Sequence, residues 1–389
     1  MANTTTFING TILTPGLQLQ NSTLTVSGGK IIDISHQPNG PPLDSARIID
    51  VRGGFLCPGF IDIHVNGGGR RLAMEGTYDA VCGMAAAHSR FGTTALLPTT
   101  VAWSIDEQLR ALQAIAEATE KGTGTARVLG AHMETPFLNR KKAGAHNPSY
   151  LKEPSIELLA KFYEASRGTL RIITIAPELP GAPELIAYAR SKGIIVSAGH
   201  SLATFEEGQA AIKSGVALCA HLFNAMPPIS ARDPGLAVAF LDSDEAMVEV
   251  ITDGVHVHPG MLELAIKSKH ASKVLVVSDA TPPAGTDDQV WELEGQKVNI
   301  VGFTGYLEDG TICGSALTMG SAFRVLCEKT GTDVADAALM CASNQARLLG
   351  ERHKGEIALG KDADLVILDT KLRVRLTMIE GTVVYEDLR

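Results

Sequence analysis

The chain has 389 residues, of which 45% are hydrophobic and 20% are charged. This composition is typical of a folded globular protein and excludes extensive disorder, and the length allows one large domain with a smaller one beside it. The formal net charge of -9 at pH 7 gives no electrostatic reason to bind nucleic acid or an anionic membrane, so we expect neither as a partner.

The two ends of the chain are rich in short β-strand patterns. Residues 6–52 and 355–388 both consist of short apolar runs broken by Gly, Pro, Asn or Asp, a pattern that predicts strands joined by turns. Neither end has enough apolar area for a core of its own. We therefore predict that residues 1–53 and 355–389 combine into one small β-sandwich domain, with residues 54–354 as the large domain.

The large domain repeats one unit, a short apolar strand followed by an amphipathic helical stretch. Strands that are apolar throughout are buried on both faces, as in a parallel sheet covered by helices. Eight such units in this length favour a (β/α)8 TIM-like barrel. A doubly wound open sheet is the alternative, but the GGGRR segment after the first strand does not fit its phosphate-binding fingerprint. The predicted strands are 55–65, 93–99, 126–134, 170–178, 194–200, 217–222, 247–253 and 273–280.

After the eighth strand we predict a long loop and then two further helices, over 316–329 and 333–349. Two of the predicted helices of the large domain begin with a capping-box pattern, Ser104 with Glu107 and Thr204 with Glu207.

Ionisable residues stand at the carboxyl ends of the predicted strands, the face that carries the active site in barrel enzymes. Any one of them has an ordinary structural explanation, such as a core histidine or a helix cap. Their co-occurrence at one rim indicates a site, because several converging ionisable groups are costly unless a metal or a reaction uses them. The strand-end residues, all ionisable except Thr99, are His64, Thr99, Glu134, Glu178, His200, His221, Asp253 and Asp279.

Glu134, His200 and His221 supply one carboxylate and two imidazoles, a ligand set typical of catalytic zinc, with an open position for water. Asp279 ends the last strand, which lies beside the first once the barrel closes, and we predict that it acts as general base. A divalent metal here would lower the pKa of water and polarise a carbonyl. We predict one metal per subunit, with Zn2+ first and Fe2+, Mn2+, Co2+ or Ni2+ as alternatives.

Several local motifs, taken in order, resemble the N-acetylglucosamine-6-phosphate deacetylases of the amidohydrolase superfamily. They are PGFIDIHVNGGG, GAHMETPFLNRKKAGAHNP, VSAGHS, AHLFNAMPP with RDPG, ITDGVHVHP, VSDAT and GSALTM. The resemblance implies a hydrolase that removes the acetyl group of an amino-sugar phosphate, and it implies a homodimer. It also assigns Glu134, His200 and His221 as metal ligands and Asp279 as the catalytic acid and base.

The same resemblance implies how the substrate is held. His146, in GAHNP, would contact the sugar and polarise the acetamide carbonyl, and Asn224 and Ala225, in HLFNAM, would hold the substrate. Arg232 and His256 would bind the phosphate, one of them reaching across the dimer interface. Arg suits this role because its guanidinium binds phosphate through two hydrogen bonds.

The chain departs from the family pattern at three places. The first strand ends in His64-Val65-Asn66 rather than His-x-His, and because Asn binds transition metals poorly we do not expect a complete second metal site. His64 remains a candidate ligand or a donor behind the ligands. Thr135 stands where the family usually has Gly, and a β-branched residue would be a hindrance there if the position needs a positive φ or a close approach of the substrate. Cys313 lies near the predicted pocket and is expected to be a buried thiol rather than a nucleophile.

Two other functions remain open. A cyclic-amide hydrolase of the dihydroorotase or hydantoinase kind would carry a Lys at the end of the fourth strand, where this chain has Glu178. A catalytically inactive binding relative would be expected to have lost one of the ligands or Asp279, and all are present.

The segments that would mark secretion or membrane insertion are missing from the sequence. The N-terminus lacks a basic segment followed by an apolar run, and no apolar stretch is long enough to span a bilayer. The six cysteines are scattered without a CxxC pair, so we predict no disulfide framework. We expect a cytoplasmic protein.

Overall fold

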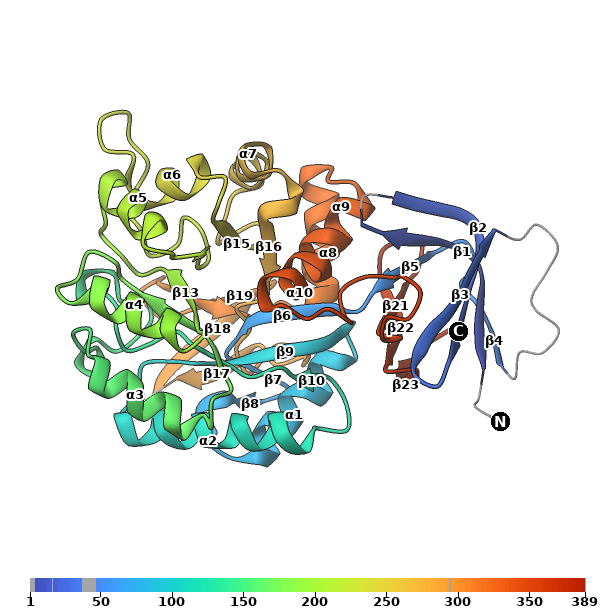
Figure 1. Cartoon of the computed structure of the whole chain (residues 1–389), viewed down its shortest axis with the longest axis horizontal. Coiled ribbons are helices and arrows are strands. Elements are labelled where there is room, and N and C mark those ends of the chain that lie inside the picture. The colour runs from blue at the N-terminus through green and yellow to red at the C-terminus, as the bar shows by residue number, and fades with distance from the viewer. Residues whose placement is uncertain (1–3, 16, 37–46, 294, 389) are drawn as a thin grey trace.

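The computed structural model describes residues 4–15, 17–36, 47–293 and 295–388. Figure 1 shows a large body of strands surrounded by helices and, beside it, a smaller part made of strands. The smaller part contains strands from both ends of the chain, the blue and the dark red ones.

The large body is a nearly closed barrel of parallel strands, as the sequence predicts. Neighbouring strands pair in parallel from β6 around to β16. The last strand meets the first through a bridge between Val65 and Ala280 and a 2.9 Å hydrogen bond from the Asp279 amide to the His64 carbonyl. The strands are β6 (Phe60–Val65), β9 (Thr93–Thr100), β10 (Arg127–Val128), β11 (Ala131–Met133), β12 (Leu170–Ile175), β13 (Ile195–Ala198), β14 (Leu218–Cys219), β15 (Met247–Ile251) and β16 (Val274–Val277).

Helices alternate with these strands and cover the barrel (Figure 1). Both predicted capping boxes are present, at Ser104 with Glu107 and at Thr204 with Glu207. The helices of the barrel are α1 (Tyr78–Ser89), α2 (Ile105–Lys121), α3 (Ile156–Ala165), α4 (Ala182–Ser191), α5 (Phe205–Lys213), α6 (Gly235–Asp242) and α7 (Pro259–Lys269), with short 3-10 turns η1 (Ala73–Glu75), η2 (Arg140–Lys142), η3 (Pro148–Tyr150) and η4 (Ala271–Lys273).

Two helical segments follow the barrel, as expected. The first is α8 (Met319–Thr330). The second runs from α9 (Val334–Ala338) through a π-helical turn, η5 (Leu339–Ser343), into α10 (Asn344–Leu349). None of the helices in the described ranges combines the length and the apolarity needed to cross a membrane.

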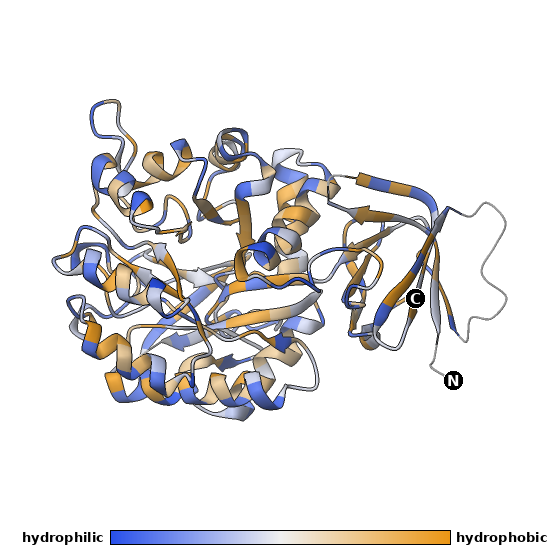
Figure 2. Ribbon diagram, viewed as in Figure 1, coloured by the Kyte–Doolittle hydropathy of each residue, from blue (hydrophilic) through white to orange (hydrophobic). Residues whose placement is uncertain are grey.

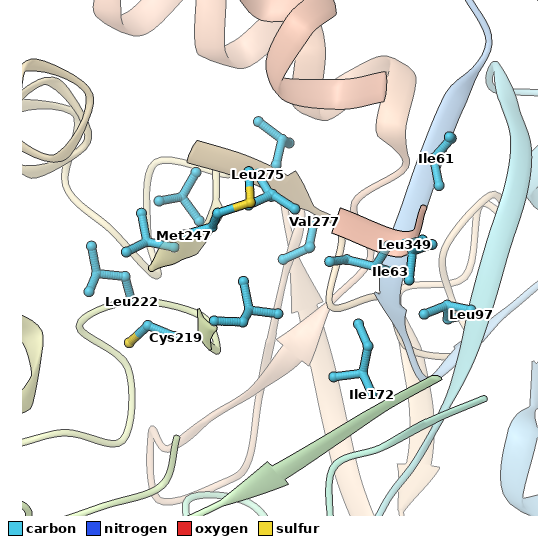
Figure 3. Packing of buried hydrophobic residues seen from close by; sticks show 14 of the residues in the cluster. Ile61, Ile63, Leu97, Ile172, Cys219, Leu222, Met247, Leu275, Val277 and Leu349 are labelled. Carbon is cyan, nitrogen blue, oxygen red and sulfur yellow. The ribbon is translucent and has the colours of Figure 1, made fainter. Parts of the chain in front are cut away.

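The barrel strands are apolar because they are buried on both faces. Every residue of β6, β9 and β15 is buried, and Figure 2 shows orange stretches along the barrel strands, such as β6. Figure 3 shows side chains from β6, β9, β12, β14, β15 and β16 packed together, among them Ile63, Leu97 and Val277. Full burial of each such side chain stabilises the fold by about 1.5–3 kcal/mol. The core therefore fixes the strand ends that carry the site.

Strands from both chain ends share one sheet outside the barrel, which confirms that the ends combine into a separate domain. The buried side chains of this sheet, such as Phe7, Leu24 and Leu376, form a second core. The boundaries at residues 53 and 355 remain a prediction; β5, just after the first of them, pairs within this sheet. The strands are β1 (Thr5–Thr14), β2 (Leu17–Ser27), β3 (Lys30–His36), β4 (Arg47–Asp50), β5 (Phe55–Pro58), β21 (Leu365–Leu368), β22 (Val374–Ile379) and β23 (Thr382–Glu386).

A buried ion network supports this second core. The ammonium of Lys354, with 8% of its side chain exposed, lies 2.7 Å from Asp364 and 3.0 Å from Asp362. Lys30, on β3, contacts the same Asp362 at 2.6 Å. Asp362 therefore joins strand β3 to the segment that leaves the barrel, and Asp364 holds the Lys354 ammonium beside it.

The predicted long loop after the eighth strand is wrong, because that segment folds into a four-stranded antiparallel sheet. Residues Val298 and Ile300 are buried while Lys297 and Val301 are exposed, an alternation that is typical of a half-buried strand. The alternation is short and interrupted by Gly302 and Gly310, so it is hard to see in the sequence. The strands are β17 (Val290–Leu293), β18 (Gln296–Val301), β19 (Thr304–Tyr306) and β20 (Ile312–Ser315); a shorter hairpin, β7 (Gly67–Gly68) with β8 (Arg71–Leu72), follows β6.

Candidate active site

A pocket of about 220 Å³ opens at the carboxyl ends of the barrel strands. Its floor comes from loops that follow β11, β13, β14 and β16, and strand β20 contributes to its wall. The predicted site residues that line it are Glu134, His146, His200, His221, Asn224, Ala225, His256 and Asp279.

Three predicted metal ligands converge on one point of this pocket. Glu134 Oε1 lies 3.2 Å from His200 Nε2 and 3.1 Å from His221 Nε2, and the two imidazole nitrogens lie 3.1 Å apart. His146 Nε2 approaches the other oxygen of Glu134 at 3.3 Å. All three predicted ligands are buried.

The hydrogen bonds behind the cluster orient these nitrogens as cation ligands. His200 Nδ1 lies 2.7 Å from the carbonyl oxygen of Lys142, and a carbonyl only accepts, so Nδ1 carries the proton. The lone pair of Nε2 therefore faces the carboxylate of Glu134. Two electron-rich atoms 3.2 Å apart repel each other unless a cation lies between them. Glu134, His200 and His221 therefore fit a divalent metal ion, which would lie between their facing lone pairs.

The electrostatics of the cluster agree with this description. Burial would raise the pKa of Glu134, but the neighbouring His64 and His146 hold that pKa well below its usual range. Burial lowers the pKa of His200 to about 4, so its imidazole is neutral near pH 7 and able to bind a metal. Burial opposes protonation of His221 too, yet the Glu134 carboxylate raises its pKa. A positive charge is favoured at this point.

His64 joins the cluster, and Glu249 holds it there. His64 Nδ1 lies 2.9 Å from Glu249 Oε2, while its Nε2 lies 3.4 Å from Glu134 Oε1 and 3.7 Å from Asp279 Oδ1. A carboxylate behind a histidine fixes its tautomer and directs the other nitrogen toward a metal. Glu249 also accepts a hydrogen bond from the backbone N–H of His221 at 3.2 Å. Burial opposes a charge on His64, but Glu134 and Glu249 raise its pKa well above the usual value.

Glu249 was missed by the sequence reasoning. It is fully buried in the middle of β15. The available signal is a lone Glu in the apolar run MVEVI, because an unpaired carboxylate is rarely buried at such a place.

Asp279 is fixed by Asn66, the residue that departs from the His-x-His pattern. Asn66 Nδ2 donates a 2.9 Å hydrogen bond to Asp279 Oδ1. Burial, with the charge of Glu134 adding to it, raises the pKa of Asp279. A carboxylate with a raised pKa at the wall of a pocket suits a group that both accepts and returns a proton.

The backbone is strained where these side chains enter the site. His200, His221 and Asp279 have φ values of 47°, 27° and 47°, in the left-handed region that residues with a Cβ rarely adopt. Ala225, another predicted site residue, has a φ of 53°. Such strain clusters at functional sites, where the surrounding packing enforces it. Here each strained residue directly follows a barrel strand or lies in the loop after one.

The GAHNP loop brings His146 over the cluster, and Gly144 makes this approach possible. The φ of Gly144 is 61°, and a Cβ at this position would lie 3.3 Å from His200 Cε1. Glycine accepts this conformation and this close contact. His146 then lies beside His200, with ring centroids 4.9 Å apart.

The predicted phosphate residues lie in different surroundings. His256 lines the pocket, and its Nδ1 bonds to Asp253 Oδ2 at 2.6 Å; Thr304 donates to the same oxygen at 2.8 Å. Asp253 thus orients His256 with its other nitrogen available. Arg232 is exposed on the loop after β14, outside the pocket lining. Within a single chain, the structure does not bring Arg232 to the site.

The other strand-end residues have structural roles. Glu178 accepts hydrogen bonds from Asn139 (2.9 Å), Ser201 (2.7 Å) and the Leu202 amide (2.6 Å). Thr99 accepts from the Val65 amide at 2.9 Å. Glu178 therefore fixes loops at the rim of the barrel, and Thr99 joins the ends of β9 and β6.

Thr135 and Cys313 do not disturb the site. Thr135 is buried, its backbone avoids the left-handed region, and its hydroxyl donates to Gln108 at 3.3 Å. The positive φ that would make a β-branched residue unfavourable is therefore absent at Thr135. Burial, followed by the charge of Asp279, raises the pKa of Cys313 to about 12, so this thiol is not a thiolate at neutral pH.

Comparison with known proteins places this arrangement in a family. The model of the amidohydrolase family matches residues 55–384. The chain belongs to the amidohydrolase family, whose members depend on bound metal.

Its relatives narrow the resemblance further, to the deacetylases that the sequence motifs predicted. An N-acetylglucosamine-6-phosphate deacetylase of Bacillus subtilis is 34% identical, with 96% of this chain and 95% of the relative covered. An N-acetylgalactosamine-6-phosphate deacetylase of Escherichia coli O157:H7 is also 34% identical, with 84% and 87% covered. The structure of a mutant N-acetyl-D-glucosamine-6-phosphate deacetylase from Mycobacterium smegmatis, in complex with N-acetyl-D-glucosamine-6-phosphate, superimposes with a TM-score of 0.91 at 30% identity and covers 99% of both chains.

Proposed function

We propose that this chain is a metal-dependent deacetylase that hydrolyses N-acetylglucosamine-6-phosphate to glucosamine-6-phosphate and acetate. The observation that carries the proposal is the convergence of Glu134, His200 and His221 within 3.2 Å of one another, beside Asp279, in a pocket at the barrel mouth. The near full-length similarity to deacetylases of this substrate supports it.

In this proposal Glu134, His200 and His221 hold one divalent cation. Bound there, the cation supplies Lewis-acid chemistry: it polarises a carbonyl and lowers the pKa of water. Zn2+ suits one carboxylate and two imidazoles, and Fe2+, Mn2+, Co2+ or Ni2+ also accept these ligands. His64 is a further candidate ligand; without a second histidine at Asn66 we propose no complete second site.

The residues around the cluster handle the proton and the carbonyl. Asp279 accepts a proton from the attacking water and later returns it to the departing nitrogen, for which its raised pKa is suited. His146, beside Glu134, donates toward the acetamide oxygen and stabilises the charge that develops there. Asn66 keeps the Asp279 carboxylate pointed at the reacting atoms.

The far end of the substrate is held by His256, Asn224 and Ala225, all of which line the pocket. Arg232 reaches the phosphate from the partner subunit of a homodimer. Its exposed position outside the pocket supports this role, and so do the exposed side chains of Ile229 (42%) and Val255 (47%) on the loops after β14 and β15. Apolar side chains exposed beside a site are expected where a partner covers them.

We also propose that the protein is cytoplasmic. Its partner would be a small-molecule substrate rather than a nucleic acid or a membrane. The negative net charge supports the partner assignment. The six cysteines are free thiols, which is the expected state in a reducing compartment.

The cyclic-amide hydrolase alternative is weaker because Glu178, at the position of the bridging Lys, is committed to three hydrogen bonds at the rim. An inactive relative is disfavoured because the cluster and Asp279 are complete.

Acetate release tests the proposal directly. The metal-loaded protein is assayed with N-acetylglucosamine-6-phosphate, its galactosamine epimer and unphosphorylated N-acetylglucosamine, and metal content is measured on the same sample. We expect the glucosamine phosphate to give the highest kcat/KM, with about one metal per chain, as a single three-ligand site implies. Bound metal without acetate release from any of the three would refute the deacetylase assignment.

A further inference from the structure

The active-site pocket has one polar end and one aromatic end. The chain has two tryptophans, and both Trp103 and Trp291 line this pocket, together with Leu72 and Val101. The apolar lining is more extensive than an acetyl methyl group needs. An amino-sugar phosphate is polar over most of its surface, so the position of this aromatic end decides which part of the substrate it meets.

The barrel topology places the two ends on opposite sides of the mouth. Asn224 and His256 follow β14 and β15, whereas Leu72 and Trp103 follow β6 and β9. In the order of the strands around the barrel, β9 and β14 are separated by β11, β12 and β13 on one side and by β15, β16 and β6 on the other. The aromatic end therefore faces the proposed phosphate end across the barrel, with the cluster of Glu134, His200 and His221 between them.

The chemistry of the substrate assigns the acyl group to the aromatic end. In a hexosamine 6-phosphate the C6 substituent and the C2 nitrogen lie on opposite sides of the pyranose ring. If the phosphate is held by His256 and the amide carbon lies at Glu134 and Asp279, the remainder of the acyl group continues away from the phosphate. That direction leads toward Val101 and Trp103.

The aromatic end opens onto a second hollow. Leu72, Trp103 and Trp291 line both the active-site pocket and a neighbouring hollow of about 750 Å³. Trp103 packs with the buried residues Leu72 and Met74, and Trp291 packs with Val298 and Cys313 of the strand sheet. Both indoles thus pack against buried residues on one side while remaining partly exposed to the pocket.

We infer that this end is an acyl-chain subsite, and that the protein hydrolyses N-acyl groups longer than acetyl, such as propanoyl and butanoyl, from the same amino-sugar phosphate. The inference rests on the proposed function. The reaction is the same hydrolysis: water adds to the amide carbon, the C–N bond breaks, and a longer carboxylate leaves with the amine. A butanoyl group has two methylenes more than an acetyl group, and their burial at the aromatic end is worth a factor of about ten in binding. This gain offsets the cost of fitting the larger acyl group into the pocket.

The test compares N-acetyl, N-propanoyl and N-butanoyl glucosamine-6-phosphate on the metal-loaded wild-type protein. We expect the butanoyl compound to keep kcat/KM within about tenfold of the acetyl compound, in line with the value of its methylenes. A drop of more than tenfold would overturn the subsite, while acetyl hydrolysis would still support the deacetylase. Failure to hydrolyse all three would instead remove the proposed function.

Val101→Phe narrows the aromatic end, and we expect it to lower the butanoyl-to-acetyl ratio of kcat/KM at least tenfold. Arg232→Ala is the control, because a phosphate contact affects both substrates equally and leaves the ratio unchanged. An equal loss for both substrates in Val101→Phe would mean that the wall meets the sugar ring, and it would overturn the assignment. Should Val101→Phe not fold, the wild-type series decides by itself.

Discussion

The side-chain amide of Asn66 donates a 2.9 Å hydrogen bond to the carboxylate of Asp279. The two residues follow the first and the last strand of the barrel, 213 positions apart. The residue that departs from the two-metal pattern is therefore the one that orients the proposed acid and base.

The amide of Asn66 stabilises the ionised form of Asp279. Replacing Asn66 by Leu removes this donor. The pKa of Asp279, already raised by burial, should rise further. Because a general base must be ionised, activity is lost as pH falls through this pKa, and the acid limb of kcat/KM should move to higher pH. Hydrogen bonds to charged groups are worth about 1.5–3 kcal/mol, so the shift should be on the order of one pH unit. An acid limb at the wild-type pH would show that Asn66 does not tune this group.

Asp279→Asn keeps the shape of the side chain but removes its ability to take a proton. We expect turnover to fall by at least about a hundredfold, in the range of general-base catalysis, with metal content and substrate affinity retained. Single-turnover assays and calorimetric binding of the phosphorylated sugar measure the two separately. Wild-type turnover would exclude Asp279 from the mechanism.

Arg232→Ala should raise KM for the phosphorylated sugar and have little effect on the unphosphorylated analogue. A charge-assisted contact to phosphate is worth about 1.5–3 kcal/mol, so KM should rise on the order of tenfold or more. Equal effects on both sugars would show that Arg232 does not bind the phosphate. Mixing the Arg232→Ala and Asp279→Asn variants shows whether Arg232 acts in its own subunit or across a dimer. If it acts across the dimer, each mixed dimer contains one intact site and part of the activity returns.

Glu249→Gln should weaken metal binding, although the side chain of Glu249 does not line the pocket. The carboxylate holds the Nδ1 proton of His64 and the amide of His221, and residues that orient metal ligands typically contribute about 10–100-fold to affinity. Competition with a chelator of known affinity measures the loss, and activity at saturating metal should recover. Unchanged metal affinity would limit Glu249 to a packing role.

Lys354→Met should destabilise the fold while leaving the active site intact. It leaves the carboxylate of Asp364, with 2% of its side chain exposed, without its cation, and breaking a buried pair typically costs about 3–5 kcal/mol. Urea unfolding measures the change in free energy. The double variant Lys354→Met, Asp364→Asn is the matched control and should regain part of the loss, since no uncompensated charge remains.

The sequence by itself determined the barrel and most of the candidate site. Apolar runs bury both faces of a strand, so the runs ending in Glu134, His200 and Asp279 could be recognised as barrel strands, and strand ends in a parallel barrel meet at one face. Two capping boxes were also readable, because a cap depends on residues three positions apart.

Only the tertiary structure decided which distant residues act on one another. The sequence does not reveal that Glu249 stands behind His64, that Asn66 holds Asp279, or that β17 to β20 form a sheet whose Trp291 lines the pocket. These relationships join segments far apart along the chain, and they depend on strand register and loop path. A local pattern records what each residue's own strand or helix requires, whereas the partner across the barrel is set by how the strands close on one another.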